Sequence, residues 1–507
     1  MASSAVVPAL GLIDHLPVLT VVVPLLAAPL CVMFGNRSVA WTLAFLASVI
    51  SFACSAHLLL QVMDGDVISY ALGGWAPPLG IEYRIDAANA LLLFLISGIS
   101  MIVLPYALQS VKHEILESQQ TLFYCCYLLC FTGLLGVVAT GDAFNVFVFL
   151  EISSLSTYVL IAMGARRDKR ALTAAYDYLI LGTIGATFFV IGIGFLYMAT
   201  GTLNMADLSE RITLLEDSRT IQAAFAFIIV GMGLKAAIYP LHLWLPNAYT
   251  FAPSVVTIFL AATATKAAIY VLIRFMFSVF EPEVVFDLGS IRTVILPLSI
   301  LAMFAASIIA VFQTDVKRML AYSSVAQIGY MLLGLSFITV TGLTASLLHL
   351  FNHGITKAAL FMAVGAFVFR VGGSFGNQIR GLGKRMPWTS FAFVIGGLSL
   401  IGVPGTAGFI SKWVLIDASL ELGWWPVAAA IVASSLLAVI YVWRVVELLY
   451  LKEAPASSSA TEIPMTMLVP MWGMALACVW FGFDTELTLG AARTAAESLL
   501  SGYGGAN

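Results

Sequence analysis

Gly231-Met-Gly-Leu-Lys-Ala-Ala-Ile-Tyr-Pro240 is an apolar stretch that contains both a lysine and a helix-breaking proline. Five apolar segments later, Gly402-Val-Pro-Gly-Thr-Ala-Gly-Phe-Ile-Ser-Lys412 combines the same features. Because five is an odd number, two such copies would cross a membrane in opposite directions. Inverted repeats with interrupted helices at corresponding positions are typical of transport sites. The two stretches therefore predict a membrane transport fold with two broken helices.

The rest of the chain has the composition of a polytopic membrane protein. Of its 507 residues, 61% are hydrophobic and only 10% are charged, whereas soluble domains carry about 25% charged residues. The apolar segments are long enough for helices that span lipid, while a β-barrel needs alternating strands of about ten residues. We expect an all-α fold with about fourteen transmembrane helices, at 16–35, 38–62, 88–109, 121–140, 143–164, 173–199, 220–246, 252–277, 291–312, 318–338, 341–369, 388–417, 425–450 and 464–483.

The segments outside these spans are short, with two exceptions. The connection 63–87 contains a Gly-Gly-Trp-Ala-Pro-Pro turn and predicts a small hairpin. The tail from Asp484 to Asn507 is mildly amphipathic and is expected at the membrane interface. The N-terminus lacks the basic region and cleavage site of a signal peptide, so we expect the first apolar segment to be retained. The six cysteines lie in apolar spans and are expected to be buried free thiols.

The basic residues predict an orientation. Four of the 24 lysines and arginines fall inside spans; of the others, fourteen lie on one side of the membrane and six on the other. The positive-inside rule assigns the richer side, which includes Arg166, Arg167, Lys317 and Arg318, to the cytoplasm. Both termini are then expected on the outer side of a bacterial inner membrane.

Five charged residues inside spans carry the candidate chemistry: Glu151, Lys235, Lys266, Lys357 and Lys412. Each costs about 2.5–3.5 kcal/mol at a helix centre, so together they cost roughly 15 kcal/mol. One lysine near a helix end could reach the membrane surface, and a single Glu–Lys pair could be structural. Four lysines with one carboxylate instead favour a proton relay, because burial makes a lysine ammonium easier to deprotonate.

Histidines extend the predicted relay. His349 and His353 are four residues apart, on one helical face and one turn from Lys357. A proton relay, a metal site and simple packing are all compatible with this spacing. His242 follows Pro240 and would either relay protons or donate to a carbonyl freed by the proline.

Two aspartates are possible entrances to the relay. Asp142 lies at the outer mouth of the fifth span, where a helix N-cap is the simpler alternative. Asp177 lies in the sixth span near its cytoplasmic end and could instead partner a lysine. The sequence has no Gly-rich phosphate loop and no cysteine quartet, so no cofactor or metal is expected, and it has no nucleic-acid-binding motif.

These motifs resemble the antiporter-like subunits of respiratory complex I, membrane-bound hydrogenases and Mrp-type multisubunit cation/proton antiporters. The resemblance runs from about residue 16 to 450, and 199–208 looks most like the D-type chain of Mrp antiporters. The matching segments are 73–82, Phe149-Leu-Glu151, Pro240-Leu-His-Leu-Trp-Leu-Pro246 with Ala252-Pro253, Lys317-Arg-Met-Leu-Ala-Tyr-Ser-Ser, His353-Gly-Ile-Thr-Lys357 and 402–409.

The resemblance implies a division of the chain into four parts. These are a three-helix segment with an outer hairpin (1–120), two inverted five-helix units (121–277 and 291–450), and a C-terminal helix and tail (451–507). It also implies a Glu151–Lys235 pair, with Lys266 as the bridging lysine and Lys412 as the terminal lysine. The chain departs from many relatives at Asn247, where they have Asp, and at Asp177, where they have a basic residue.

The predicted function is that of a proton-translocating subunit of a multisubunit Na⁺ (or K⁺)/H⁺ antiporter. Its relay would run from Glu151 through Lys235, Lys266, His349, His353 and Lys357 to Lys412. The alternative is a proton-pumping membrane subunit of a complex-I-like or hydrogenase-type redox enzyme. A third class is a scaffold that does not conduct ions, against which the five intramembrane charges argue. Under the first hypothesis the chain is a secondary transporter subunit and not an enzyme, and its partners are other membrane subunits, H⁺ and Na⁺ or K⁺.

Overall fold

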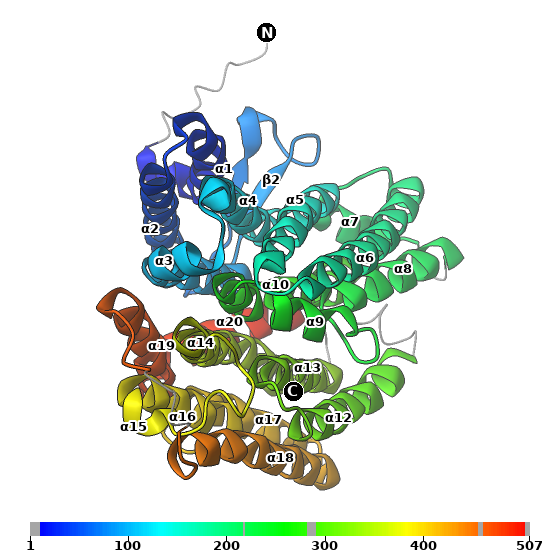
Figure 1. Ribbon diagram of the computed structural model, residues 1–507. Coiled ribbons are helices and arrows are strands. Elements are labelled where there is room, and N and C mark those ends of the chain that lie inside the picture. Colours follow the sequence, from blue (N-terminus) through cyan, green and yellow to red (C-terminus); the bar gives the residue numbers. More distant parts are fainter. Residues whose placement is uncertain (1–10, 216–217, 281–289, 455–459, 502–507) are drawn as a thin grey trace.

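The computed structural model describes residues 11–215, 218–280, 290–454 and 460–501. It is a bundle of roughly parallel helices with one small hairpin (Figure 1). Twelve helices in the described residues are long and apolar enough to cross a membrane. The predicted spans 220–246 and 388–417 are each broken into two short helices. The all-helical membrane fold is therefore confirmed, while the count of fourteen spans stays a prediction.

The bounds of the elements in the first half are as follows: a 3₁₀ turn (Leu12–His15), α1 (Leu16–Phe34), α2 (Arg37–Val62), β1 (Ile68–Ala71), a 3₁₀ turn (Leu72–Gly74), β2 (Glu82–Ile85), α3 (Ala87–Glu114), a 3₁₀ turn (Glu117–Gln119), α4 (Gln120–Ala139), α5 (Ala143–Ala162), a 3₁₀ turn (Met163–Arg166), α6 (Arg170–Thr200), α7 (Met205–Ile212), α8 (Arg219–Lys235), α9 (Trp244–Phe251), α10 (Ser254–Arg274) and a π turn (Phe275–Val279).

The second half contains α12 (Ser290–Val311), α13 (Val316–Phe337), α14 (Val340–Val371), α15 (Leu382–Arg385), α16 (Pro387–Ile401), α17 (Ala407–Glu421), α18 (Trp425–Tyr450), α19 (Met465–Phe483) and α20 (Glu486–Leu500). The predicted link between the two five-helix units is described only up to Phe280 and from Ser290 onward. Parts of the predicted first and last segments, 1–10, 455–459 and 502–507, also lie outside the described residues.

Polar residues at the helix starts explain several boundaries. The Asp86 carboxylate accepts from the backbone N–H of Ala88 and Asn89, both at 3.1 Å, and so caps α3. Asn36 caps α2 in the same way. Such side chains satisfy backbone donors that a helix cannot satisfy itself, which matters most where water is scarce.

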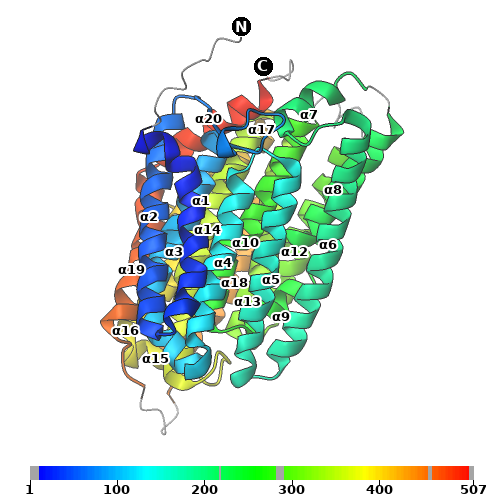
Figure 2. The same cartoon turned by 90° about the horizontal axis from the view of Figure 1, so that it is seen from above.

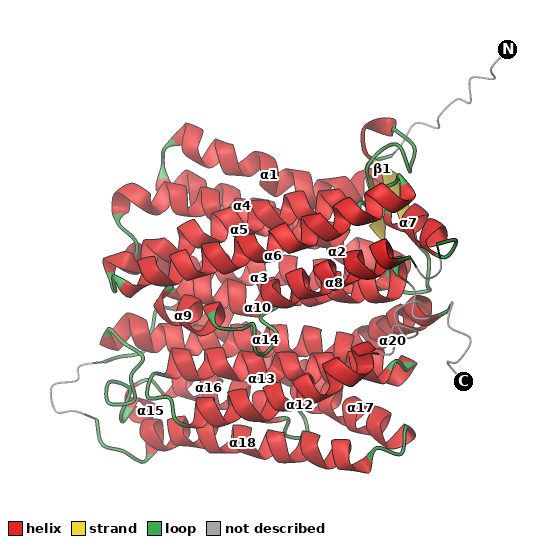
Figure 3. Ribbon diagram, turned by 90° about the vertical axis from the view of Figure 1, so that its right-hand side faces the viewer, coloured by secondary structure: helices red, strands yellow, loops and turns green. Residues whose placement is uncertain are grey.

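The helices run between two ends of the bundle (Figure 3). We call one the hairpin end, because β1 and β2 pair there in antiparallel fashion, with Ile68 opposite Ile85, inside the segment predicted to form a hairpin. The other is the basic end, which holds the connections 163–169, 312–315 and 372–386. The predicted amphipathic tail contains α20, which lies across the hairpin end (Figure 2) and buries its alanine-rich face on α3 and α14.

The interior of the bundle is built from α3, α10, α13 and α14. α10, α13 and α14 are almost wholly buried, whereas α6, α12 and α18 expose most of their length to the surroundings. In Figure 1, α10 and α14 lie where the two groups of helices meet. Polar groups on these central helices must find partners within the protein. The candidate site lies on and between them.

Candidate functional site

The first broken helix ends at a lysine. α8 stops at Lys235, and Ala237 has a positive φ of 57°, which ends the helical path. The next helix, α9, begins at Trp244, and the indole N–H of Trp244 donates to the carbonyl of Leu234 at 2.9 Å. This bond satisfies one of the carbonyls that the break sets free. Lys235 is thereby held at the broken end, beside α5 and α6.

Lys235 has two partners on α5. Its Nζ lies 2.6 Å from Oγ of Ser154 and 3.6 Å from Oε1 of Glu151. Oε1 of Glu151 is buried and has no hydrogen-bond partner among the described residues. The Lys235 side chain is 7% exposed and that of Glu151 is 25% exposed. The expected Glu–Lys pair is therefore formed as a loose ion pair, with the serine as the closer partner.

Lys266, in the middle of α10, is completely buried. Its ammonium donates to the carbonyl of Ala261, on its own helix. Among the described residues, no carboxylate lies within the 4.0 Å ion-pair distance of Lys266, Lys357 or Lys412. These three lysines are held by neutral groups.

Lys357 and two histidines line one face of α14. The ammonium of Lys357 is fully buried and donates to the carbonyl of Leu320, at 2.7 Å, and to the hydroxyl of Ser323. The rings of His349 and His353 stack with their centroids 6.0 Å apart. The stack places two titratable rings beside Lys357 on the same helix.

The two histidines differ in their partners. His349 contacts Ser411 through Nδ1, at 2.8 Å, and Gln327 through Nε2, at 2.9 Å. Both ring nitrogens of His353 are buried and have no partner among the described residues. Within the described residues, no three His, Cys, Asp or Glu side chains are grouped closely enough to share a metal ion.

The second broken helix places a lysine after the break. α16 ends at Ile401 and α17 begins at Ala407, with Lys412 in its second turn. The ammonium of Lys412 reaches back to the carbonyls of Leu400, at 3.0 Å, and Ile401, at 2.9 Å. These are the free carbonyls at the C-terminus of α16, where the helix dipole favours a positive charge.

Aromatic and glycine residues shape the Lys412 site. Nζ of Lys412 lies 4.8 Å from the centre of the Tyr330 ring, a cation–π contact. A Cβ at Gly402, whose φ is 91°, would come within 2.9 Å of the Lys412 side chain, and one at Gly408 would come within 1.8 Å of the Ser399 carbonyl. The glycines of this motif are therefore required for the close approach of α17 to α16.

The possible entrances are placed as follows. Asp142 accepts from the backbone N–H of Asn145 at 2.7 Å and so is the N-cap of α5, although burial raises the pKa of its carboxyl. Asp177 is half-buried on α6 and forms no ion pair among the described residues, so it does not pair with a lysine there. His242 is buried, stacks on Tyr239 at 4.9 Å, and its Nδ1 has no partner in the described part of the chain. A role as an entrance stays a prediction for all three.

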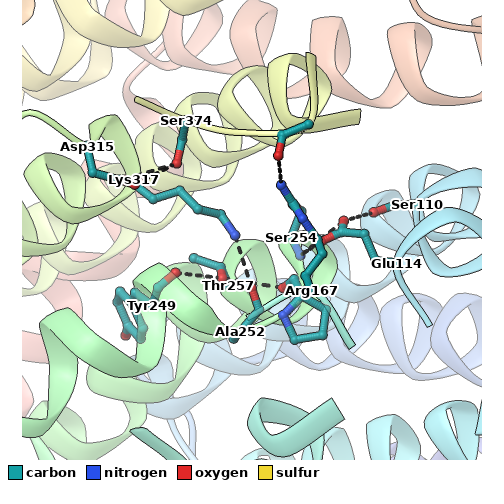
Figure 4. Close-up of polar contacts among 12 residues, drawn as sticks. Ser110, Glu114, Arg167, Tyr249, Ala252, Ser254, Thr257, Asp315, Lys317 and Ser374 are labelled. Atoms are coloured by element: carbon teal, nitrogen blue, oxygen red, sulfur yellow. Dashed lines mark hydrogen bonds and ion pairs between the residues drawn. The ribbon is translucent and has the colours of Figure 1, made fainter. Parts of the chain in front are cut away.

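The sequence reasoning missed a buried charged cluster at the basic end (Figure 4). Glu114, the last residue of α3, accepts from the Ser254 backbone N–H at 3.0 Å and from Arg167 at 3.3 Å. Lys317, counted from the sequence among the charges at the membrane surface, is only 3% exposed and donates to the Ala252 carbonyl at 3.0 Å. A cavity of about 170 Å³ opens beside these residues.

One property sets α13 apart from the other spans, although it does not single out Lys317. α13 has the lowest mean hydropathy of the twelve candidate spans, 1.3, although it is among the most buried. A helix that is both deeply buried and relatively polar must carry groups that serve other helices. Gln327 and Tyr330, which hold His349 and Lys412, are on the same helix and were also missed.

Comparisons with known proteins agree with this geometry. Residues 140–438 match the family model described as "NADH:quinone oxidoreductase/Mrp antiporter, TM". The chain is 40% identical over 491 residues to the N-type subunit of the NADH-quinone oxidoreductase of Desulforudis audaxviator, covering 93% of this chain and 96% of that protein. It is 29% identical to the D-type subunit of the Na⁺/H⁺ antiporter of Alkalihalophilus pseudofirmus, over 93% and 94% of the two chains.

The fold is also similar to that of a solved assembly. A chain of the Mrp complex from Dietzia sp. DQ12-45-1b superposes with a TM-score of 0.87 at 27% identity, over 97% of this chain and 98% of that one. The resemblance inferred from the motifs is thus confirmed. Since the family model covers more than half of its residues, the chain belongs to the transmembrane-subunit family shared by NADH:quinone oxidoreductase and Mrp antiporters.

Proposed function

We propose that this chain translocates protons across the membrane through a relay of Glu151, Lys235, Lys266, His353, His349, Lys357 and Lys412. The observation that carries the proposal is the set of three fully or almost fully buried lysines whose ammonium groups contact only neutral groups. Static charges in lipid are expected to be paired, whereas groups that exchange protons need partners that tolerate both states.

The Glu151–Lys235 pair is the element of this relay that could switch. At 3.6 Å and an effective dielectric constant of 20, two unit charges attract by about 4.6 kcal/mol. Moving one proton against 100 mV takes about 2.3 kcal/mol. Opening or closing the pair would therefore change the energy of a proton on Lys235 by an amount comparable to this load. The nearby Ser154 hydroxyl is a second hydrogen-bond acceptor for the Lys235 ammonium.

We also propose that both broken helices cross the membrane, which gives fourteen spans and two inverted units, 121–277 and 291–450. The packing supports this proposal, because α4, α5 and α6 contact one another in chain order, as do α12, α13 and α14. In each set the third helix also packs on a broken helix, α8–α9 or α16–α17. The segments 1–120 and 451–507 then flank these units. The charge bias supports placing the basic end at the cytoplasm and the termini outside.

The driving force that we favour is exchange of Na⁺ or K⁺ for protons, within a complex with other membrane subunits. It is supported by the likeness to the D-type antiporter subunit and to a chain of the Mrp complex. Coupling to a redox enzyme is the second candidate, and the 40% identity with the N-type subunit of an NADH-quinone oxidoreductase favours it. The relay is the same in both cases.

The test is proton transport by the native complex, purified with this chain and reconstituted in vesicles. A Na⁺ or K⁺ gradient should drive proton movement measured with an enclosed pH dye, and Lys235→Ala should abolish it. Proton movement driven only by an electron donor and quinone would show that the chain is coupled to a redox enzyme and not to Na⁺ or K⁺ exchange. Full transport by the Lys235→Ala complex under either driving force would refute the relay itself.

A further inference from the structure

The inner face of α13 carries a row of polar groups that contact titratable side chains of α14 and α17. The Leu320 carbonyl accepts hydrogen bonds from Lys357, at 2.7 Å, and from the hydroxyls of Ser323 and Ser324. Ser323 also accepts from Lys357. Since 317, 320, 324 and 327 are spaced by three or four residues, they fall on one side of the helix.

The row continues toward the hairpin end. Gln327 contacts His349 at 2.9 Å, and the Tyr330 ring lies under the ammonium of Lys412. Lys357, His349 and Lys412, which come from α14 and α17, are thus all held by side chains or carbonyls of α13. α13 therefore contacts all three of these residues in the second half of the proposed relay.

The row begins at the basic end with Lys317. Its ammonium donates to the Ala252 carbonyl, at the corner between α9 and α10 (Figure 4). Lys317 also lines the 170 Å³ cavity. Glu114, Arg167 and Asp315 are the charged groups whose fields act on it. From Lys317 to Ser323 the helix rises by about 9 Å, the length of six residues.

The other charged groups of this cavity are occupied by structural contacts. Glu114 accepts from the first backbone N–H of α10 and from Arg167. Arg167 also donates to the Gly372 carbonyl at the end of α14. Asp315 caps α13 through Arg318 N–H, at 3.1 Å, and accepts from Ser374. Lys317, in contrast, contacts one carbonyl and stands between the cavity and the Lys357 site.

We propose that Lys317 is the proton-uptake residue at the basic end, and that α13 leads protons from it to Lys357. This inference rests on the proposed function. A hydronium ion in the cavity gives its proton to the neutral Lys317 amine and becomes water. The resulting ammonium passes a proton through water and the Ser323 hydroxyl to the neutral Lys357 amine, and Lys317 returns to its neutral form. The path starts from a residue that none of the predicted entrances included.

Three variants of the reconstituted complex test this proposal. Lys317→Met removes the amine, and proton transport should fall at least about tenfold. Lys317→Arg keeps a positive donor for Ala252, but a guanidinium does not release its proton, so transport should fall by a similar factor. Arg318→Gln, at the half-buried neighbouring position, removes a charge from the same end of α13 and should leave the rate unchanged.

The arginine variant separates uptake from structure. If Lys317→Arg transports at the wild-type rate, Lys317 only ties α13 to the α9–α10 corner and the proposal is overturned, whether or not Lys317→Met assembles. Lys412→Met in the same assay keeps the two proposals apart. If the Lys412→Met complex does not transport protons while both Lys317 variants do, the proposed uptake at Lys317 is wrong and the proposed relay is retained. If Lys412→Met is active, the proposed function itself has failed.

Discussion

The two broken helices stabilise a buried lysine in different ways. At the first break, Lys235 closes α8 and has a carboxylate, Glu151, at 3.6 Å. At the second, Lys412 follows the break and bonds to the last carbonyls of α16, with no carboxylate within ion-pair distance in the described residues. One lysine is stabilised by a full opposite charge and the other by partial charges at a helix terminus.

The difference suggests different roles. A carboxylate pair can open and close, so that the energy of a proton on Lys235 changes by several kcal/mol. A helix C-terminus is fixed and stabilises a cation by at most about 2 kcal/mol. We therefore expect the first break to respond to neighbouring charges and the second to act as a proton-binding site of constant affinity. The following predictions are designed to break or sharpen this contrast.

The largest effect is expected at the second break. Lys412→Met removes the proton-binding amine, and proton transport by the reconstituted complex should fall by about 10²-fold or more. Lys412→Arg should fail as well, because it keeps the charge but holds its proton. Lys384→Met, an exposed lysine at the basic end, is the control and should transport normally. A transporting Lys412→Arg complex would mean that only the charge of this residue matters.

Glu151→Gln should have the next largest effect, at the first break. The Lys235 ammonium then loses its charged partner and keeps only Ser154. The ion pair is loose and its carboxylate is partly exposed, so its loss should lower the transport rate by about tenfold, which corresponds to about 1.4 kcal/mol. The optimum should also move to lower pH, because the amine is more easily deprotonated. The rate against pH is the measurement, with exposed Glu453→Gln as the control.

An unchanged pH optimum in the Glu151→Gln complex would count against the switch. It would leave the Glu151–Lys235 contact as a structural pair, and the two breaks would then be alike in function despite their different partners.

Asp86→Asn should affect stability without affecting the relay. Asp86 pairs with Arg274 at 2.7 Å and fixes the hairpin end of α10, the helix of Lys266. Burial alone raises the pKa of the Asp86 carboxyl, but the charge and hydrogen bonds of Arg274 outweigh burial, so its pKa lies below the ordinary 3.8. This stabilisation is therefore fully present above that pH and is lost as the pH falls through the lowered pKa.

Removing one partner of a buried pair costs about 3–5 kcal/mol, so the Asp86→Asn complex should unfold at a clearly lower temperature between about pH 5 and pH 8. Exposed Asp66→Asn at the same end should not change the unfolding temperature. If the specific transport rate of the folded Asp86→Asn complex also collapsed, the hairpin end would belong to the proton path.

Ser154→Ala should have the smallest effect. It removes the 2.6 Å contact to Lys235 and leaves Glu151 as its one partner among the described residues, so the ion pair should tighten. The expected change in rate is about two- to fivefold, with an optimum shifted to higher pH, opposite to that of Glu151→Gln. Ser156→Ala is the matched control on the same helix, because that hydroxyl donates to the backbone carbonyls of Ile152 and Ser153 and not to Lys235. Equal behaviour of the two serine variants would remove Ser154 from the switch.

Much of the fold was readable from the chain because lipid imposes strict rules. Long apolar segments predicted the helices, and Pro240 and the glycines of 402–409 marked the positions of both breaks within a few residues. The lysines Lys235, Lys266, Lys357 and Lys412 could be singled out because a charge is conspicuous in an apolar helix. Lys317 could not, since a lysine one residue inside a helix usually reaches the surface, and its burial depends on α9, α10 and α14.

The sequence by itself determined that this protein is a helical membrane protein with titratable groups in its interior, because the energy of each residue in lipid depends mainly on its own chemistry. Only the tertiary structure decided what those groups contact. The tertiary structure places Ser154 closer to Lys235 than Glu151 is, and it brings Lys412 to the end of α16. It also places three members of the proposed relay against α13. Partners at 2.6–3.6 Å are set by packing between helices, which no local pattern encodes.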